Sequence, residues 1–243
     1  MRLSAFSHRC TKEILREPIN LCFGLGFPVV LLFLLSAIQS NIPVPLFEIE
    51  RLTPGVTVFG LSFITLFSAT LVAKDRETAL LQRLYTTPIR PWEYILGYML
   101  PFFPLAVGQS VVCYLTSIAL GLSLSVNILF AILMIIPISL MYIALGILCG
   151  SVLNVKSVGG VCGALLTNVS AWLSGIWFDL DLIGGSLKRI ANLLPFVHAV
   201  EIERLAVYGN FTEILPHMLP VFGYTIFITA GAVLLFFRQM KSL

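Results

Sequence analysis

Long uncharged stretches are the feature that most constrains the fold of this chain. Only 11% of its 243 residues are charged, whereas a soluble domain usually carries about 25%. A charge in the middle of a bilayer is costly, so uncharged runs of about 20 residues mark membrane-spanning helices. Such runs cover residues 18–47, 52–73, 94–155, 157–178 and 214–237. The sequence therefore predicts an all-α membrane protein.

The run 94–155 is too long for one helix and fits two helices joined by a turn at Gly121–Asn127. We therefore predict six spans, near residues 19–38, 54–73, 95–119, 128–150, 158–178 and 219–237. Residues 1–243 are treated as a single transmembrane domain. Its cytoplasmic segments are 1–17 and 74–93, and its extracytoplasmic segment is 179–217.

The lysines and arginines flank these spans unevenly. With the N-terminus inside, only Arg51, Lys188, Arg189 and Arg204 lie on the outer side. Basic residues concentrate on the cytoplasmic side of membrane proteins, so both termini are predicted to be cytoplasmic, in a plasma membrane and most simply a bacterial inner membrane. The net charge of +3 is scattered at the edges of apolar runs, and no nucleic acid partner is expected. The inner residues are Arg2, Arg9, Lys12, Arg16, Lys74, Arg76, Arg83, Arg90, Lys156, Arg238 and Lys241.

The basic N-terminal segment has the periodicity of a helix. Leu3, Phe6, Cys10 and Ile14 fall on one face, and the basic residues fall on another. An amphipathic helix lying in the membrane surface fits this pattern, and a short disordered basic tail is the alternative. Pro18 is expected to mark the elbow into the first span.

The inner loop between the second and third spans, Lys74–Tyr94, carries an apolar ridge at helical spacing. Pro88 disfavours helical geometry at the residue before it, and Pro91 suits the first turn of the next helix. The loop is therefore predicted to form a short amphipathic helix under the membrane. Such a helix acts either as a mechanical lever or only as an anchor at the membrane boundary.

Three dipeptides follow one another in this loop: Arg76–Glu77, Arg83–Leu84 and Thr87–Pro88. In order and spacing they resemble the inner loop of the permease subunit of type 2 ABC transporters. The chain departs from that family at Ala79–Leu80, where the family has Gly-Thr, and at Gln82, where it often has glutamate.

A second similarity follows the fifth predicted span. Leu194–Pro195 precedes a segment containing Glu201 and Arg204, as the family often has Leu-Pro before a helix with an acidic residue and an arginine. The six-span layout with both ends inside also agrees. The resemblance therefore covers nearly the whole chain.

The resemblance implies an ATP-driven exporter in which two permeases, identical or paralogous, form the pathway. An ATP-binding cassette ATPase subunit would dock under each permease and hold ATP and Mg. This chain contains no P-loop, GxxxxGK[ST], so it is not expected to be an enzyme or to bind a cofactor or metal itself. The loop helix would seat in a groove of the ATPase. The residues implied for coupling are Arg76, Glu77, Leu80, Leu81, Arg83, Leu84, Thr87 and Pro88.

The resemblance also places the second and fifth spans beside the substrate pathway. These spans carry aromatic, hydroxyl and amide side chains but no charge, which favours a hydrophobic or amphipathic cargo such as a drug, an antibiotic or a lipid. Ordinary helix packing is the alternative reading of the same residues. The pathway residues implied are Phe59, Ser62, Phe63, Thr65, Phe67, Asn168 and Trp172.

Two further questions stay open on the sequence. A secondary transporter or channel without an ATPase remains the alternative function, since Pro101, Pro104 and Pro137 can break helices at membrane depth. The apolar outer segment 179–213 predicts short re-entrant helices that cap the outer exit, with an ordinary packed outer loop as the alternative.

Overall fold

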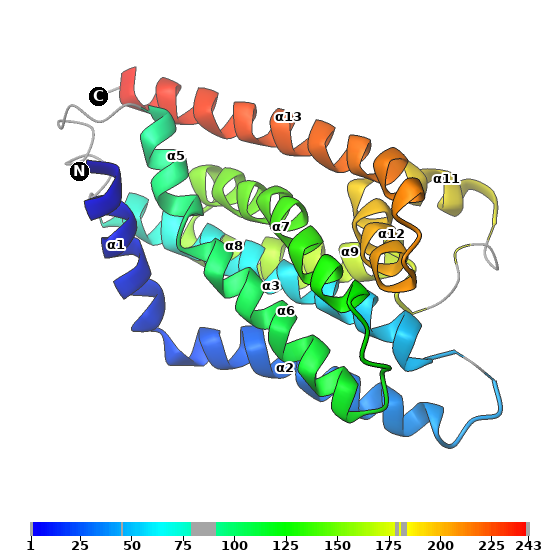
Figure 1. The fold of residues 1–243 in the computed structure, drawn as a ribbon. Helices are drawn as coiled ribbons and strands as arrows, with labels where there is room; N and C mark the ends of the chain where they lie inside the picture. Colours follow the sequence, from blue (N-terminus) through cyan, green and yellow to red (C-terminus); the bar gives the residue numbers. More distant parts are fainter. Residues whose placement is uncertain (1, 45, 79–90, 178–179, 181–183, 242–243) are drawn as a thin grey trace.

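The computed structural model describes residues 2–44, 46–78, 91–177, 180 and 184–241, and this part of the chain is helical without any β-strand (Figure 1). The helices are α1 (Arg2–Leu15), α2 (Pro18–Gln39), α3 (Ile49–Glu77), α5 (Pro91–Met99), α6 (Phe102–Ala119), α7 (Asn127–Val152), α8 (Val155–Val158), the π-helix η1 (Gly159–Leu166), α9 (Thr167–Leu173), α11 (Gly185–Leu193), α12 (Pro195–Tyr208), the 3₁₀ turn η2 (Phe211–Glu213) and α13 (Ile214–Lys241).

Five helical stretches in the described residues are long and apolar enough to cross a membrane. They are Pro18–Gln39, Ile49–Glu77, Trp92–Ala119, Asn127–Val152 and Phe211–Arg238. The chain is therefore a multi-pass membrane protein, as predicted. The third stretch is interrupted between α5 and α6, because Pro101 has no backbone N–H to continue the hydrogen-bond ladder.

The predicted fifth span, 158–178, overlaps α8, η1 and α9, which together end at Leu173. These three segments follow one another directly, and the residues at their junctions keep right-handed helical backbone angles. The π-helical middle turn is wider than an α-helical turn. Val158 and Cys162 from this region pack against Ala69 and Ala73 of α3, so the segment lies alongside α3.

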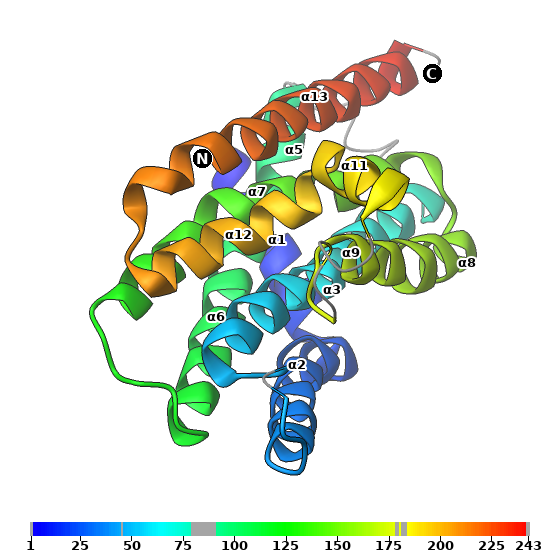
Figure 2. The same cartoon turned by 90° about the vertical axis from the view of Figure 1, so that its right-hand side faces the viewer.

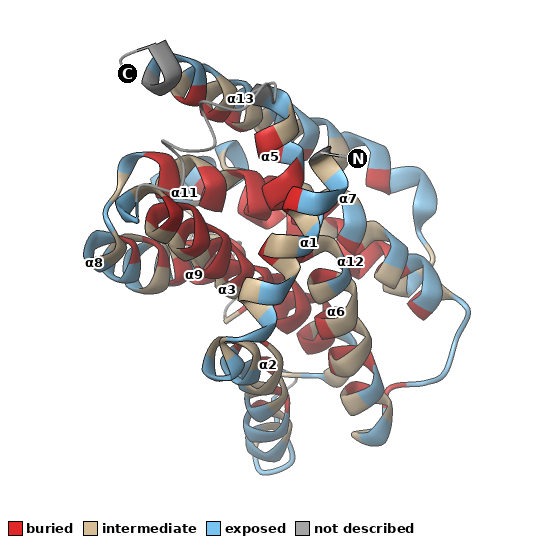
Figure 3. Ribbon diagram, turned by 90° about the vertical axis from the view of Figure 1, so that its left-hand side faces the viewer, coloured by how far each residue is buried: buried red, intermediate tan, exposed pale blue. Residues whose placement is uncertain are grey.

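Helix α3 is the centre of the bundle. It packs against α2, α6, α7, α12 and η1, and most of its residues are buried. By contrast, α2 and α13 turn large apolar side chains outward, as Phe23 and Phe33 of α2 and Phe227 and Leu234 of α13 show. Figure 3 shows this difference in burial between the central and outer helices. The outward faces are suited to lipid, which is as apolar as these side chains.

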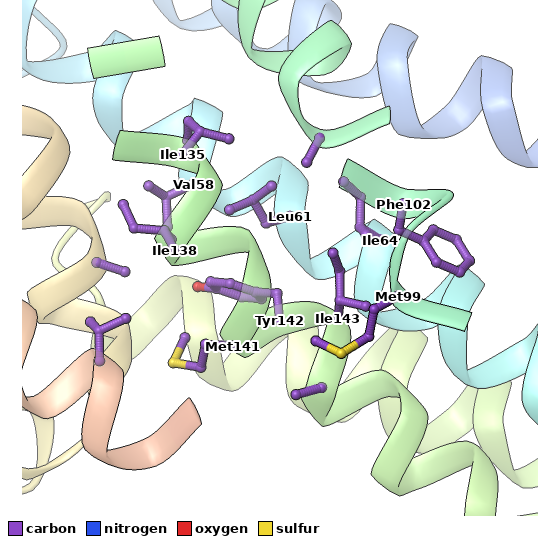
Figure 4. Packing of buried hydrophobic residues seen from close by; sticks show 14 of the residues in the cluster. Val58, Leu61, Ile64, Met99, Phe102, Ile135, Ile138, Met141, Tyr142 and Ile143 are labelled. Carbon is purple, nitrogen blue, oxygen red and sulfur yellow. The ribbon is translucent and has the colours of Figure 1, made fainter. Parts of the chain in front are cut away.

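The contact between α3 and α7 is close because α7 presents two glycines to α3. A Cβ placed on Gly146 would lie 1.9 Å from the Ser68 hydroxyl, and one on Gly150 would lie 2.4 Å from the Ala69 carbonyl oxygen. The Thr65 hydroxyl donates to the Tyr142 carbonyl across the same contact, at 2.8 Å. Interlocking apolar side chains extend the contact (Figure 4): Val58, Leu61 and Ile64 of α3, and Ile135, Ile138 and Ile143 of α7.

The two ends of the bundle differ. The start of α1, the end of α3 and the end of α13 lie at one end, and α11 and α12 lie at the other (Figure 1). Helix α12 runs across that second end (Figure 2) and packs against α3, α7 and α13. Its Glu203 is buried and accepts a 2.7 Å hydrogen bond from the Tyr114 hydroxyl of α6. Helices thus occupy the predicted outer segment.

The close α3–α7 contact can be tested with a single methyl group. We expect Gly146→Ala to destabilise the protein by about 1–3 kcal/mol, because overpacking forces α3 and α7 apart. The measurement is the thermal unfolding midpoint of the purified protein in detergent.

Gly108→Ala in α6 is the matched control, since a Cβ there meets nothing within 4 Å. That variant should be at least as stable as the parent, because alanine is a better helix former than glycine. An unchanged midpoint in Gly146→Ala would contradict the packing described for α3 and α7.

Candidate coupling site at the end of α3

Four consecutive charged residues, Lys74–Glu77, close α3 at the end of the bundle that also holds α1. Successive residues of an α-helix point about 100° apart, so the four side chains leave α3 in different directions. Each of them meets a different part of the chain. We call this set the α3 charge cluster.

Asp75 is the buried member of the α3 charge cluster, with its side chain 3% exposed. The Arg9 guanidinium of α1 forms a two-pronged ion pair with its carboxylate, and one of these contacts is 2.7 Å. The Tyr98 hydroxyl of α5 donates to the same carboxylate at 2.8 Å. A buried carboxylate with an arginine fork and a hydroxyl donor has its acceptors satisfied. Asp75 therefore joins α1, α3 and α5.

Apolar packing surrounds this ion pair. The Phe6 ring of α1 meets the Tyr98 and Tyr94 rings edge to face, at centroid distances of 4.9 and 5.8 Å. Burial raises the pKa of the Cys10 thiol to about 12, so Cys10 is a neutral side chain at physiological pH. The apolar face predicted for the N-terminal helix is thus turned toward α5.

Arg76 and Glu77 connect α3 to the junction of α7 and α8. The Arg76 guanidinium donates to the carbonyl oxygens of Gly150 and Val152, at 3.1 and 3.3 Å. These carbonyls belong to the last turn of α7, where a helix leaves acceptors unsatisfied and favours a positive charge. Glu77 accepts a 2.8 Å hydrogen bond from the backbone N–H of Val155, which begins α8. A carboxylate is likewise favoured at a helix start.

Lys74 pairs with Glu17 at the elbow between α1 and α2. Glu17 also accepts a hydrogen bond from the Asn20 side chain in the first turn of α2. Helix α1 ends at Leu15 and α2 starts at Pro18, so a helix break lies at the position where the elbow is predicted. The α3 charge cluster therefore reaches α1, the elbow, α5, α7 and α8.

The sequence pointed to Arg76 and Glu77 but missed Lys74 and Asp75 as site residues. The sequence signal for these residues was the run of four charged residues at the end of an apolar span. Four consecutive side chains of a helix cannot all point to the same side, so some of them must face other parts of the protein. The other residues predicted for coupling, Leu80, Leu81, Arg83, Leu84, Thr87 and Pro88, lie outside the described residues, as does most of the predicted loop helix.

The predicted pathway residues of α3 lie mainly inside the packed chain. The Ser62 hydroxyl is 3.0 Å from the Ser170 hydroxyl of α9, and Thr65 donates to α7 as described above. The rings of Phe59 and Phe63 pack edge to face at 5.8 Å and also contact Phe27 of α2. These residues hold α3 against α2, α7 and α9.

Two predicted pathway residues of α9, Asn168 and Trp172, are exposed on the surface of the single chain. The Asn168 side chain donates to the Ala164 carbonyl one turn earlier, at 2.8 Å. Because the two residues are one turn apart, they share a face of the helix. The fifth-span region thus presents an amide and an indole away from the rest of the chain.

Phe67 differs from the other pathway residues of α3, because it lines a cavity of about 490 Å³ between the elbow and α3. Leu66 and Ile19 add apolar surface to this cavity, and Arg16 and the paired Lys74 and Glu17 add charged groups. A hollow with an apolar wall and a few charged groups suits an amphipathic molecule. Among the described residues, no group of three or more His, Cys, Asp or Glu side chains could hold a metal ion.

The family of the chain follows from its similarity to known proteins. A family model described as ABC-2 type transporter matches residues 1–208. The chain belongs to the ABC-2 type transporter family. No match to the chain was found among curated proteins. Membership makes the chain a membrane permease component without an ATPase of its own, and it implies an ABC ATPase partner and usually a dimeric arrangement.

The buried ion pair of this ABC-2 permease can be tested by a double-mutant cycle. We expect Asp75→Asn to lower stability by about 1–3 kcal/mol, since it leaves Arg9 without its carboxylate partner. Arg9→Gln in the Asp75→Asn background should cost little more, because the interaction is already lost. The measurement is the thermal midpoint of the four proteins in detergent.

Glu13→Gln is the control for this cycle, because Glu13 lies 3.9 Å from Arg9 on the exposed side of the same helix. Exposed pairs of this kind contribute little, so its midpoint should match that of the parent. Additive losses in the Arg9 and Asp75 variants would show that the pair does not join α1 to α3.

Proposed function

We propose that this chain is the permease subunit of an ATP-driven exporter that moves a hydrophobic or amphipathic compound out of the cytoplasm or the inner leaflet. The compound is a drug, an antibiotic or a lipid. Two permeases form the pathway, and each is driven by an ABC ATPase that binds ATP and Mg. The observation that carries the proposal is the α3 charge cluster at the start of the loop whose sequence resembles the family's coupling loop.

The connections of the α3 charge cluster support a coupling role for that loop. The loop follows Glu77 directly in the chain, so a force on the loop acts first on the end of α3. Asp75 and Arg76 tie this end to α1, α5 and the end of α7. A push by the ATPase would therefore reach several spans at once instead of bending one helix end.

The shape and chemistry of the cavity beside Phe67 support the proposed class of cargo. The cavity opens between α2 and α3 at the same end of the bundle as the α3 charge cluster. Its apolar wall would take the hydrophobic part of a compound, and Arg16 would face an anionic or polar head beside the Lys74–Glu17 pair. We propose that Phe67 receives cargo there and that Asn168 and Trp172 face the pathway between the two permeases.

The proposed topology has six spans with both termini in the cytoplasm. The fifth of these spans is formed by α8, η1 and α9, whose unbroken helical backbone is long enough when the three are taken together, and α13 is the sixth. The cytoplasmic side is the end that holds α1, the α3 charge cluster and the end of α13, because most of the basic residues lie there. Helix α1 would then lie at the inner membrane surface, and α11 and α12 would cap the outer exit.

The proposal is tested first by purification of the chain from its own host in a mild detergent, with identification of the proteins that stay bound. An ATP-binding subunit in stoichiometric amount supports the exporter. Recovery of the permease alone, from a detergent that preserves such complexes, would favour a secondary transporter or a channel.

The coupling loop makes a sharper prediction. We expect Leu84→Ala, or Thr87→Ala with Pro88→Ala, to reduce ATP-driven transport into inverted vesicles by tenfold or more while ATP hydrolysis continues. The reason is that a helix seated in the ATPase must keep its apolar ridge and its Thr-Pro stop to transmit force.

Leu124→Ala is the matched control, because Leu124 is an exposed leucine in the turn before α7, at the other end of the bundle. It should transport at the rate of the parent. Full transport in the Leu84 and Thr87–Pro88 variants, with normal membrane insertion, would contradict the coupling role of the loop.

A further inference from the structure

A polar cavity of about 180 Å³ lies at the end of the bundle opposite to the α3 charge cluster. Residues of α3, α11, α12 and α13 line it, and Figure 2 shows α11, α12 and α13 near one another at this end. Space of this size accommodates several water molecules or one phosphate group. The lining residues that matter to the argument are Arg51 of α3, Lys188 of α11, His198, Glu201 and Arg204 of α12, and His217 of α13.

Arg204 is the buried anchor of this cavity, with its side chain only 9% exposed. Its guanidinium donates to the Glu201 carboxylate at 2.6 Å and to the Gly175 carbonyl at 2.9 Å. Among the described residues, its third donor group, Nε–H, meets no acceptor. A buried donor without an acceptor is costly, and arginine cannot lose its charge to reduce that cost. Arg204 is thus a permanent cation in the cavity wall, and its Nε–H is closed off from the cavity itself.

The described lining of the cavity is rich in positive charge. Arg51, Lys188 and Arg204 contribute three cations, and Glu201 contributes one carboxylate. Arg51 and Lys188 also make interactions of their own, so the argument does not require them to be free. Their charges still act on anything that enters the cavity, because the field between charges in a partly closed site is only weakly screened.

A pair of histidines forms part of the wall. The Nδ1 atoms of His198 and His217 are 2.9 Å apart, and the Nε2 atom of His198 is 2.9 Å from the Asn192 carbonyl oxygen. A carbonyl only accepts, so His198 carries its proton on Nε2. The hydrogen bond between the two Nδ1 atoms then needs one N–H group, which either ring can supply. A single N–H donor therefore joins the two rings.

We propose that this cavity binds the phosphate group of an anionic molecule, with the Arg204 guanidinium as the central cation and Lys188 and the histidine pair as further contacts. A phosphate has several acceptor oxygens and suits a site with several donors. The group comes from an anionic lipid headgroup in the outer leaflet or from phosphate in solution. The proposal concerns binding alone and does not rest on the proposed transport.

Protection of the histidines from diethyl pyrocarbonate, which modifies imidazole nitrogens, tests the proposal at the site itself. The full chain, with any subunit that co-purifies, is placed in phosphatidylcholine nanodiscs, and modification of each histidine is followed by peptide mass spectrometry. Inorganic phosphate or added phosphatidylglycerol should slow modification of His198 and His217 at least threefold. His8 is the internal reference, because it is exposed on α1 at the other end of the bundle.

Variants separate a specific site from a general effect. Arg204→Gln should abolish the protection, and Lys188→Gln, which changes a less buried residue, should weaken it even if the first variant folds poorly. Arg189→Gln is the matched control, because Arg189 is exposed beside Lys188 and outside the cavity lining, and its protection should equal that of the parent.

The two ligand arms identify the source of the phosphate. Protection by phosphatidylglycerol alone assigns the site to a lipid headgroup, and protection by inorganic phosphate alone assigns it to an anion from solution. Absence of saturable protection by both, or equal protection in the Arg204→Gln and Lys188→Gln variants, would overturn the proposal.

Discussion

A carboxylate buried in a membrane domain must be paired, because taking an ion out of water costs several kcal/mol. Asp75 meets this requirement only if α1 brings Arg9 and α5 brings Tyr98 to the end of α3. The position of α1 therefore depends on the charge of Asp75, which lies 66 residues after Arg9 in the sequence. Arg76 and Glu77 connect α3 to α7 and α8 in a similar way. Arg76 donates to a carbonyl in the last turn of α7, and Glu77 accepts from the first N–H of α8, and both backbone groups lack partners within their own helices. One helical turn thus organises this whole end of the permease.

Helix α3 links the two polar regions of the molecule. Its last turn carries the α3 charge cluster, its first turn contributes Arg51 to the polar cavity at the opposite end of the bundle, and the stretch between them is packed tightly against α7. A helix held this closely along its length shifts as a unit, because packed interiors do not deform continuously. In an ABC-2 permease, a displacement that begins at the loop after Glu77 would therefore be felt at the opposite end of the bundle, where α12 lies across α3 and α7.

The sequence predicted the parts of the fold that depend on solvent and on proline, and it missed the parts that depend on tertiary pairing. Uncharged runs located five long apolar helices, Pro18 marks the start of α2, and Pro101 marks the interruption between α5 and α6. The π-helical turn at Gly159–Leu166 depends on how neighbouring helices pack, which the local sequence pattern does not encode. Asp75 and Arg204 look like ordinary loop or surface charges in the sequence, and only the fold shows that they are buried. Ser62 and Thr65 carry hydroxyl groups of the kind expected beside a substrate pathway, but in the structure these hydroxyls form hydrogen bonds to other residues of the chain.

The central claim is that the end of α3 joins α1 and α8 into one rigid unit that is displaced when the ATPase binds ATP. The most direct test uses pulsed electron paramagnetic resonance to measure the distance between spin labels at Glu13 of α1 and Ser157 of α8. The measurement is made on the complex with its ATPase, with and without ATP. A third label on the ATPase reports whether the complex has moved. We expect ATP to change the distance from Ser157 to the ATPase and to leave the distance from Glu13 to Ser157 unchanged. A change in the distance from Glu13 to Ser157 on ATP binding would contradict the account.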